Sequence, residues 1–401
     1  MNKVFFPNLN GIRFLAAFAV FLHHFEQYRY IFGLDHFFHI PFFDGIGKLA
    51  VVCFFVLSGF LITYLLMEEK QIKSTINLKK FYIRRILRIW PVYFLLVIVG
   101  FLVLPRFSVF HVPDWSEHLS GNFYIKFLFY LLILPNLIAS FTYPIPNVTQ
   151  SWSLGTEDQF YLAWPFIIKK SHKLLSWFVG IIVVYLIIKL SIALLESSFP
   201  TERGKFFWSS IQRFWNFFAV DCMALGGIGA YLAHKKPIEW FRFIFSKPFQ
   251  IVLYSLTIFL LIIDFKIPVF KYEMYAILFI LIILNAAWNP KTLINFEFEP
   301  FKYMGKISYG FYMYHPAMIV FIINIFMPLG WTNYFALFAS SLSLAVLFSA
   351  FSFEFYEKGF LISKNKFTVV ESGIHENKNK TLFFKLMRLI KVKNPEKKSD
   401  N

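Results

Sequence analysis

The chain has 401 residues, of which 58% are apolar and only 16% are charged, whereas soluble domains carry roughly 25% charged residues. Its formal net charge is +17, but the basic residues flank apolar stretches and form no soluble basic domain, which argues against nucleic acid as a partner. Cys53 and Cys222 both lie in apolar stretches, so neither a disulfide framework nor a metal-ligand spacing is indicated. The composition predicts an all-α, polytopic integral membrane protein in contact with a lipid bilayer.

Ten stretches approach or exceed the roughly 20 apolar residues that cross a bilayer. They are 10–28, 48–67, 91–106, 154–168, 174–195, 213–233, 248–264, 272–288, 306–328 and 332–356. An eleventh, 124–142, is interrupted by a proline at its centre, which favours a re-entrant or interfacial segment. If it does not cross, 30 of the 40 Lys and Arg lie inside, against 14 if it does. The positive-inside rule therefore predicts about ten transmembrane helices in the cytoplasmic (inner) membrane, with both termini in the cytoplasm.

The first span carries polar residues that a purely lipid-facing helix would lack. Arg13 and His24 are eleven residues apart, which is about 1100° of helix rotation, so they share a face about 16 Å apart along the axis. A titratable residue near mid-membrane is costly and usually functional, and imidazole suits proton transfer near neutral pH. His24 is therefore a candidate catalytic residue. The structural alternative is a histidine hydrogen-bonded between packed helices, which is how we interpret His23.

A basic run, FYIRRILRIWP, lies between the second and third spans. Arg84 and Arg88 share one helix face, and Arg85 lies beside Arg88. Three guanidiniums where membrane meets water suit a ligand rich in phosphate, because each offers a fixed donor fork that keeps its charge. The alternative is a basic surface helix held by lipid headgroups.

Two further motifs place small or polar residues in apolar helices. In FFVLSGFLIT, Ser58 and Gly59 leave room for a close helix approach or for a ligand, and helix packing is the commoner role. In SWSLGTEDQFYLAWP, Glu157 enters an apolar helix and Trp152 could stack on a sugar. The alternative for Glu157 is charge at a helix N-terminus, with Ser153 as the cap.

Other titratable residues were weighed in the same way. His315, in GKISYGFYMYHPAM, lies near mid-depth and precedes Pro316, which kinks the helix. Asp221 is a third buried titratable group. In one outer loop, the spacing of the acidic residues and histidines is close to that of metal ligands. This cluster consists of Asp35, His36, His39 and Asp44. We interpret it as part of an aromatic-rich interfacial loop and predict no metal site.

Taken in order, the motifs NGIRFLAAFAVFLHH, FFVLSGFLIT, RRILRIWP, WSLGTEDQFYLAWP and ISYGFYMYHP resemble the membrane-bound acyltransferase family 3. The resemblance spans residues 8 to about 355. It implies ten spans and an O-acyltransferase that moves an acyl group, by default acetyl from acetyl-CoA, onto an extracytoplasmic carbohydrate or glycolipid acceptor. Asp158 departs from the family pattern, where Glu is usual.

The resemblance also implies site residues. Arg13 and His24 match the family's arginine and histidine pair, and Glu157 is expected to assist them. The residues expected to hold acyl-CoA are Arg84, Arg85, Arg88, Ser58 and Gly59. Those expected at the acceptor are Trp152, Ser153 and His315. His24 could act as general base or as a transient acyl carrier. The acceptor and the acyl chain length stay open.

We divide the chain into a transmembrane acyltransferase domain, 1–357, and a basic cytoplasmic tail, 358–401, with 11 basic and 4 acidic residues. Within the tail, LFFKLMRLIKV predicts a short amphipathic helix on an anionic leaflet, and the rest is predicted to be disordered. The rival function is a transporter of a glycan or lipid-linked intermediate with buried His and Asp as proton relays. Two similar halves, common in transporters, are not visible in the sequence.

Overall fold

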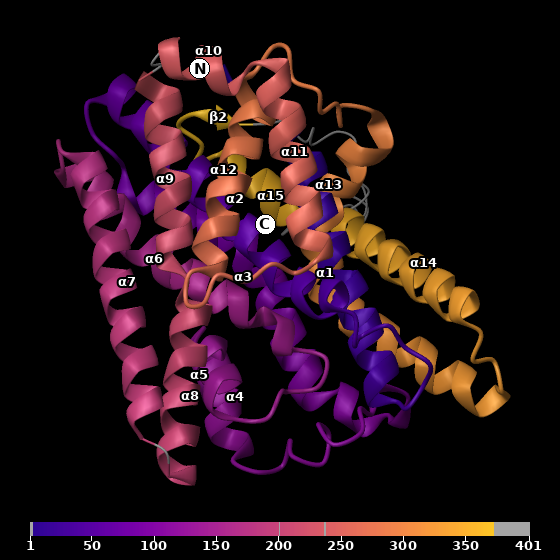
Figure 1. Cartoon of the computed structure of the whole chain (residues 1–401). Helices are drawn as coiled ribbons and strands as arrows, with labels where there is room; N and C mark the ends of the chain where they lie inside the picture. Colours follow the sequence, from indigo (N-terminus) through magenta and orange to yellow (C-terminus); the bar gives the residue numbers. More distant parts are fainter. Residues whose placement is uncertain (1–2, 200, 236–237, 373–401) are drawn as a thin grey trace, which may run out of the picture.

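The computed structural model describes residues 3–199, 201–235 and 238–372, and these form a bundle of helices (Figure 1). In chain order the helices are α1 (Leu9–Ile31), α2 (Pro41–Lys73), α3 (Leu78–Leu102), α4 (Phe123–Leu131), α5 (Pro135–Phe141), α6 (Trp152–Lys170), α7 (Leu174–Ser198), α8 (Glu202–Phe218), α9 (Val220–Lys235), α10 (Ile238–Ile244), α11 (Lys247–Ile262), α12 (Lys271–Trp288), α13 (Glu299–Phe326), α14 (Tyr334–Ser352) and α15 (Lys358–Asn365). Two short strands, β1 (Lys3–Val4) and β2 (Glu371–Ser372), pair in parallel. The prediction of an all-α polytopic membrane protein is confirmed.

Each predicted span falls on a helix, except 213–233, which falls on two, and the helices differ in length and in apolar character. Among the described residues, seven helical segments are long and apolar enough to cross, and they contain α2, α3, α7, α8 with α9, α12, α13 and α14. The shorter α11 is also apolar. Helices α1 and α6 are not among the seven, and both carry the polar residues proposed above for function. The number of crossings therefore stays a prediction.

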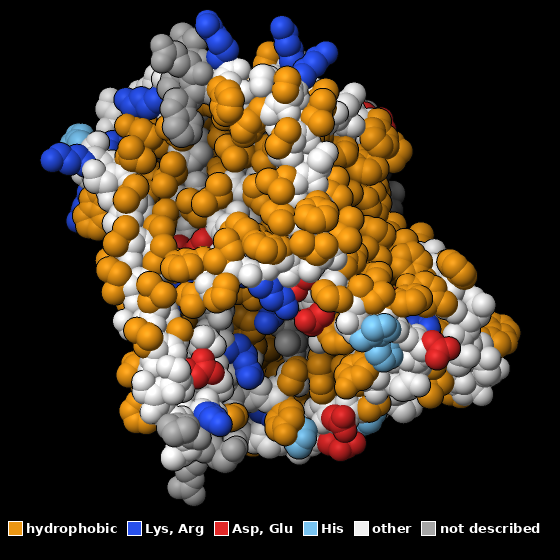
Figure 2. Space-filling model, viewed as in Figure 1, with side chains coloured by type: hydrophobic (Ala, Val, Ile, Leu, Met, Phe, Trp, Pro, Cys, Tyr) orange, Lys and Arg blue, Asp and Glu red, His pale blue; other side chains and the backbone are white. Residues whose placement is uncertain are grey.

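The exposed surface agrees with a bilayer as solvent. Large apolar side chains point outward along the bundle, including Leu194 at 68%, Val252 at 63% and Phe335 at 77% exposure. Figure 2 shows hydrophobic side chains covering most of the visible face. Exposed apolar area of this extent is rare on soluble monomers and is expected where lipid covers the protein.

The segment predicted to be re-entrant or interfacial, 124–142, is not one continuous helix. It is broken between α4 and α5, where Ile133 has a positive φ of 59°. The left-handed region is unfavourable for a β-branched residue, and Pro135 opens the next helix because it cannot continue the previous one. The interruption expected from the proline is therefore present.

The predicted span 213–233 is interrupted as well, which the sequence did not indicate. α8 ends at Phe218, Ala219 has a φ of 27°, and α9 begins at Val220. The Thr156 hydroxyl on α6 donates to the Phe217 carbonyl at 2.8 Å. A side chain on a neighbouring helix thus satisfies a backbone carbonyl at the end of α8, as helix ends inside a membrane require.

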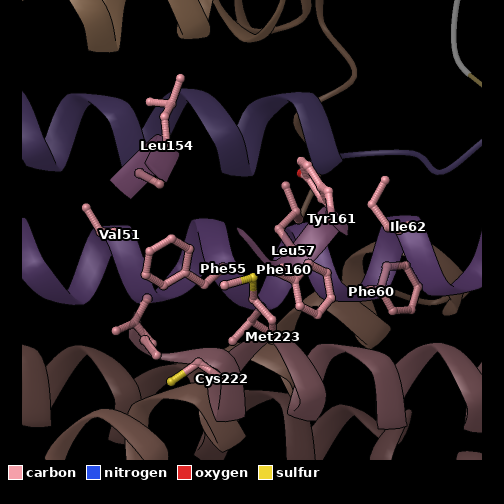
Figure 3. Packing of buried hydrophobic residues seen from close by; sticks show 14 of the residues in the cluster. Val51, Phe55, Leu57, Phe60, Ile62, Leu154, Phe160, Tyr161, Cys222 and Met223 are labelled. Atoms are coloured by element: carbon pink, nitrogen blue, oxygen red, sulfur yellow. The ribbon is translucent and has the colours of Figure 1, made fainter. Parts of the chain in front are cut away.

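The core forms where α2, α6 and α9 meet, with Phe55, Leu154 and Met223 among its buried side chains (Figure 3). α2 and α9 approach so closely that a Cβ on Gly59 would collide with the Met223 carbonyl. A Cβ on Gly226 would likewise collide with the Val56 carbonyl. Small residues allow such contact between membrane helices.

The two ends of the described chain lie side by side. Lys3 pairs with Glu371 and Val4 with Ser372. Two paired strands lie on one side of a membrane, so an even number of crossings separates them. Just before β2, α15 packs against α3, which places the beginning of the predicted tail, 358–401, against the helical domain. The boundary at 357 stays a prediction, and the amphipathic helix predicted over 382–392 lies outside the described residues.

Candidate active site

A cavity of 360 Å³ opens between α1, α2, α3, α6, α13 and α15. Its size falls within the range of about 300–1,000 Å³ that is typical of small-molecule sites. Seven of the predicted site residues line it, from four different helices: Arg13, Ser58, Arg84, Arg85, Arg88, Ser153 and Glu157. The tertiary structure therefore brings together four of the five residues predicted to hold the donor, Ser58, Arg84, Arg85 and Arg88.

The cavity is rich in positive charge. Six cationic side chains line it: Arg13, Arg84, Arg85, Arg88, Lys306 and Lys364. Three carboxylates, Glu69, Glu157 and Glu357, line it too, so the lining carries a formal excess of three positive charges. A water-filled cleft of one sign attracts ligands of the opposite sign. The cavity suits an anion that carries several charges.

The three arginines of the basic run differ in their partners. Arg84 makes an ion pair with Glu69 at 3.1 Å and donates to the Phe367 carbonyl at 2.8 Å. The Arg85 guanidinium lies against the rings of Phe81 and Tyr161, and its buried Nε has no hydrogen-bond partner. Arg88 is exposed and makes no ion pair with a described carboxylate. Two of the three guanidiniums therefore remain available to a ligand.

Glu157 belongs to a hydrogen-bonded cluster in the wall of the cavity. Its carboxylate accepts from the hydroxyls of Ser58 and Tyr161, and these two hydroxyls also contact each other. Tyr161 follows Glu157 by one helical turn, so this pairing could have been read from the sequence. Ser58 thus has a polar role, whereas Gly59 does not line the cavity and instead permits the contact between α2 and α9.

His24 and His315 meet beside the cavity. His24 Nδ1 lies 2.7 Å from His315 Nε2, and their rings are stacked with centroids 5.0 Å apart. His315 is fully buried, and its Nδ1 lies 3.0 Å from the Phe311 carbonyl. The contact joins α1 to α13 across 291 positions of sequence. Neither histidine lines the cavity.

The hydrogen bonds fix the tautomers of this pair when both rings are neutral. A carbonyl oxygen can only accept, so His315 donates from Nδ1 to Phe311. Its Nε2 must then accept from His24 Nδ1. This leaves His24 Nε2 with a free lone pair, which is the atom that a general base needs. A hydrogen bond between packed helices was the structural alternative for His24, and the fixed tautomer makes the contact compatible with catalysis as well.

Tyr312 separates the histidines from the cavity. It lines the cavity, and its ring centroid lies 6.1 Å from that of His315. The Tyr312 hydroxyl donates to the Gln150 carbonyl at 2.8 Å. It therefore accepts from the Ser153 hydroxyl, whose oxygen lies 2.8 Å away. Ser153 therefore holds this wall and does not cap α6, which follows Ser151 as its N-cap. The position of Tyr312 was not predicted.

Trp152 lies apart from the cavity. It stacks on Phe217 with ring centroids 4.1 Å apart, and Lys48 Nζ lies 5.7 Å from the Phe217 centroid. Trp152 and Glu157 are five residues apart on α6, which turns them about 140° away from each other. Glu157 lines the cavity together with the arginines, whereas Trp152 does not. Figure 2 shows a hollow, with charged side chains around it, below the loop between α11 and α12.

No group of three or more His, Cys, Asp or Glu that could hold a metal occurs within residues 3–199, 201–235 and 238–372. In the outer loop, the rings of His36 and His39 are 5.8 Å apart. Asp158 accepts from the indole of Trp90 at 3.0 Å, and neither residue lines the cavity. Asp221 is buried beside the ion pair of Lys189 and Glu273, also outside the cavity.

Comparison with known proteins identifies the family of this chain. Residues 6–350 match the family described as an acyltransferase domain, which is acyltransferase family 3. The chain belongs to this family. No solved structure matches it.

The similar proteins carry names that specify O-acetyl transfer. A protein of Staphylococcus aureus strain COL named as an O-acetyltransferase is 28% identical over 89% of this chain and 57% of its own length. The peptidoglycan O-acetyltransferase OatA of Listeria monocytogenes is 26% identical over 82% of this chain and 52% of its own. The O-acetyltransferase OatA of Staphylococcus aureus strain NCTC 8325 is 25% identical over 79% and 51%. The chain thus spans about half the length of these relatives.

Proposed function

We propose that this protein is a membrane O-acyltransferase that moves an acyl group, by default acetyl, from cytoplasmic acyl-CoA to a hydroxyl of an extracytoplasmic glycan. The observation that carries the proposal is the arrangement of a cation-lined cavity on one side of Tyr312 and a histidine with a free ring nitrogen on the other. Membership of the acyltransferase family supports it.

The cavity would hold the donor. Arg85 and Arg88 make no ion pair with a described carboxylate, and Arg13, near the N-terminal end of α1, also lines the cavity and donates to Asn10 Oδ1 at 3.0 Å. These groups would bind the phosphates of CoA, because charge-assisted forks suit phosphate oxygens. The thioester end would then extend toward Tyr312. No metal is needed for this binding.

His24 would act as the general base. Its Nε2 takes the proton from the acceptor hydroxyl while the oxygen attacks the thioester carbonyl carbon. The carbon–sulfur bond breaks, and His24 returns the proton to the leaving sulfur, so that the products are an ester and free thiol. His315 would orient the imidazole and not touch the acceptor, because it is buried behind His24. Glu157 and Arg13 would stabilise charge along the cavity.

The acceptor is proposed from the relatives. One of them is named for peptidoglycan, and we propose an envelope glycan as the acceptor of this protein. A partly exposed His24 allows the acceptor to approach from the face opposite the arginines. Trp152, which is half-buried, would contact a sugar of the acceptor.

The test is a reaction with purified protein. Full-length protein in a phosphate-free detergent is mixed with acetyl-CoA and solubilised glycan fragments, and free thiol and glycan mass are followed. We expect thiol release that depends on the glycan, together with a mass gain of one acetyl group on the glycan. Two results would overturn the proposal. One is thiol release that is the same whether or not a glycan or a small alcohol is present as acceptor. The other is no thiol release under any condition.

The sidedness is tested by labelling. We choose Ser74, after α2, and Ser120, before α4, because both are exposed. Each is changed to Cys in a background without Cys53 and Cys222, and intact cells are treated with an impermeant maleimide. Ser120→Cys should react in intact cells, and Ser74→Cys only after lysis. The reverse pattern would place the arginine end outside and contradict a cytoplasmic donor.

A further inference from the structure

The segment that follows the last long helix forms part of the wall of the cavity. Leu361, Lys364 and Asn365 of α15 line the cavity, and Thr368 and Val370 line it further along. This region lies beyond residue 350, where the family match ends, and beyond the domain boundary that we predicted. No motif in the sequence predicted that this segment would belong to the site.

Two contacts fix this segment in place. Arg84 donates to the Phe367 carbonyl at 2.8 Å while also pairing with Glu69. Further on, Glu371 and Ser372 pair with the N-terminal strand. Phe5 and Phe6, which follow that strand, line the same cavity. The two ends of the described chain thus close one end of the cavity together.

Lys364 faces other cations across this cavity. It is half-buried, and the charges that act on it most strongly are Arg88, Arg85, Arg13 and Arg84, all of which repel it. No described carboxylate lies within ion-pair distance of Lys364. Each of the cavity's carboxylates already has a partner, since Glu357 accepts from Ser352 and the other two are bonded as described above.

A lysine placed among arginines without a counter-ion is unfavourable in the free protein. The arrangement becomes favourable once an anion lies between the cations, because each contact is then a charge-assisted hydrogen bond. Arg84 is less available for this purpose than its neighbours, since its guanidinium is already bonded to Glu69 and Phe367. Lys364 lies near Arg88, so its ammonium can contribute a further contact to an anion bound by the arginines.

We propose that Lys364 binds a phosphate group of the donor together with Arg88, and that Arg84 serves as the anchor that holds its segment in place. The ligand class is a phosphorylated thioester carrier of the CoA type. The inference rests on the proposed function, because it assigns a further residue to the same donor site. The same chemistry could also hold the phosphate of a lipid headgroup, and the experiment separates these sources.

The experiment measures donor binding and turnover by the full-length protein in a phosphate-free detergent. Lys364→Ala is compared with Lys364→Arg and with Lys366→Ala, a matched control that is exposed and outside the cavity lining. We expect Lys364→Ala to weaken CoA binding about tenfold or more, as for a lost hydrogen bond between charged groups. Lys364→Arg should retain most of the affinity, and Lys366→Ala should match the wild type.

A second substrate separates binding from folding. S-Acetylpantetheine has the thioester but no phosphate, so Lys364→Ala should leave kcat/KM for it unchanged while lowering kcat/KM for acetyl-CoA. Equal losses on both substrates would mean a structural role and would overturn the proposal. Unchanged CoA affinity with less co-purified phospholipid would assign the lysine to a lipid headgroup and overturn it as well. Failure of the wild type to bind CoA would instead contradict the proposed function itself.

Discussion

The two sides of Tyr312 differ in how their polar groups are satisfied. On the cavity side, Arg85, Arg88 and Lys364 have no carboxylate partner among the described residues. On the other side, His24 and His315 form a chain of hydrogen bonds that ends on a backbone carbonyl. Charged groups without a partner can bind a ligand of opposite charge, whereas a complete series of hydrogen bonds holds a side chain in one orientation. We therefore propose that the cavity provides the affinity for the donor and that the histidines carry out the acyl transfer.

The largest effect should come from His24→Ala. Removing a general base typically costs about 10²–10⁴-fold in rate, so kcat should fall by that factor while the KM for acetyl-CoA and the thermal midpoint stay nearly unchanged. His23→Ala is the matched control, because the neighbouring ring instead contacts the Phe43 carbonyl at 2.8 Å. A His24→Ala variant that kept a tenth of wild-type activity would remove the histidine pair from the mechanism.

A smaller loss of activity is expected when His315, the hydrogen-bond partner of His24, is changed. His315→Ala keeps His24 but removes the hydrogen bond that fixes the tautomer and the orientation of its ring. We expect kcat to fall about 100-fold or less. His315→Gln can still accept from His24 Nδ1 through its amide oxygen and should recover part of that loss. If Gln and Ala behaved alike while both proteins folded normally, His315 would not act by orienting His24.

The cavity arginines should affect affinity and not turnover. Arg85→Ala and Arg88→Ala should each raise the KM for acetyl-CoA about tenfold or more, with kcat nearly unchanged, because contacts to the phosphates are equal in ground state and transition state. The corresponding Lys variants should rescue only partly, since the bidentate fork is lost. An equal change in KM for the acceptor would instead indicate anchoring to lipid.

The smallest effect tests the wall between the two regions. Tyr312→Phe removes the hydrogen bond to the Gln150 carbonyl and the partner of Ser153, which should cost about 1 kcal/mol of stability. We expect activity within severalfold of wild type, measured with thermal unfolding on the same samples. A loss as large as that of His24→Ala would mean that the tyrosine hydroxyl takes part in the reaction.

Relations within one helix were accessible from the sequence. The apolar lengths indicated a polytopic bundle, and the proline at 135 marked the break between α4 and α5. The spacing of Arg13 and His24 placed them on one face of α1, because 3.6 residues per turn fixes angles along a single helix. The same rule would have paired Tyr161 with Glu157, and it separates Trp152 from Glu157.

Relations between helices were decided by the tertiary structure. Helical periodicity cannot say which faces meet, since that depends on how closely neighbouring helices pack, as at Gly59 against α9. Only packing brings His315 to His24, directs Glu157 into the arginine cavity and carries Lys364 back to Arg88. The sequence by itself determined which chemical groups the membrane helices carry, and the packing of those helices determined which of the groups share a site.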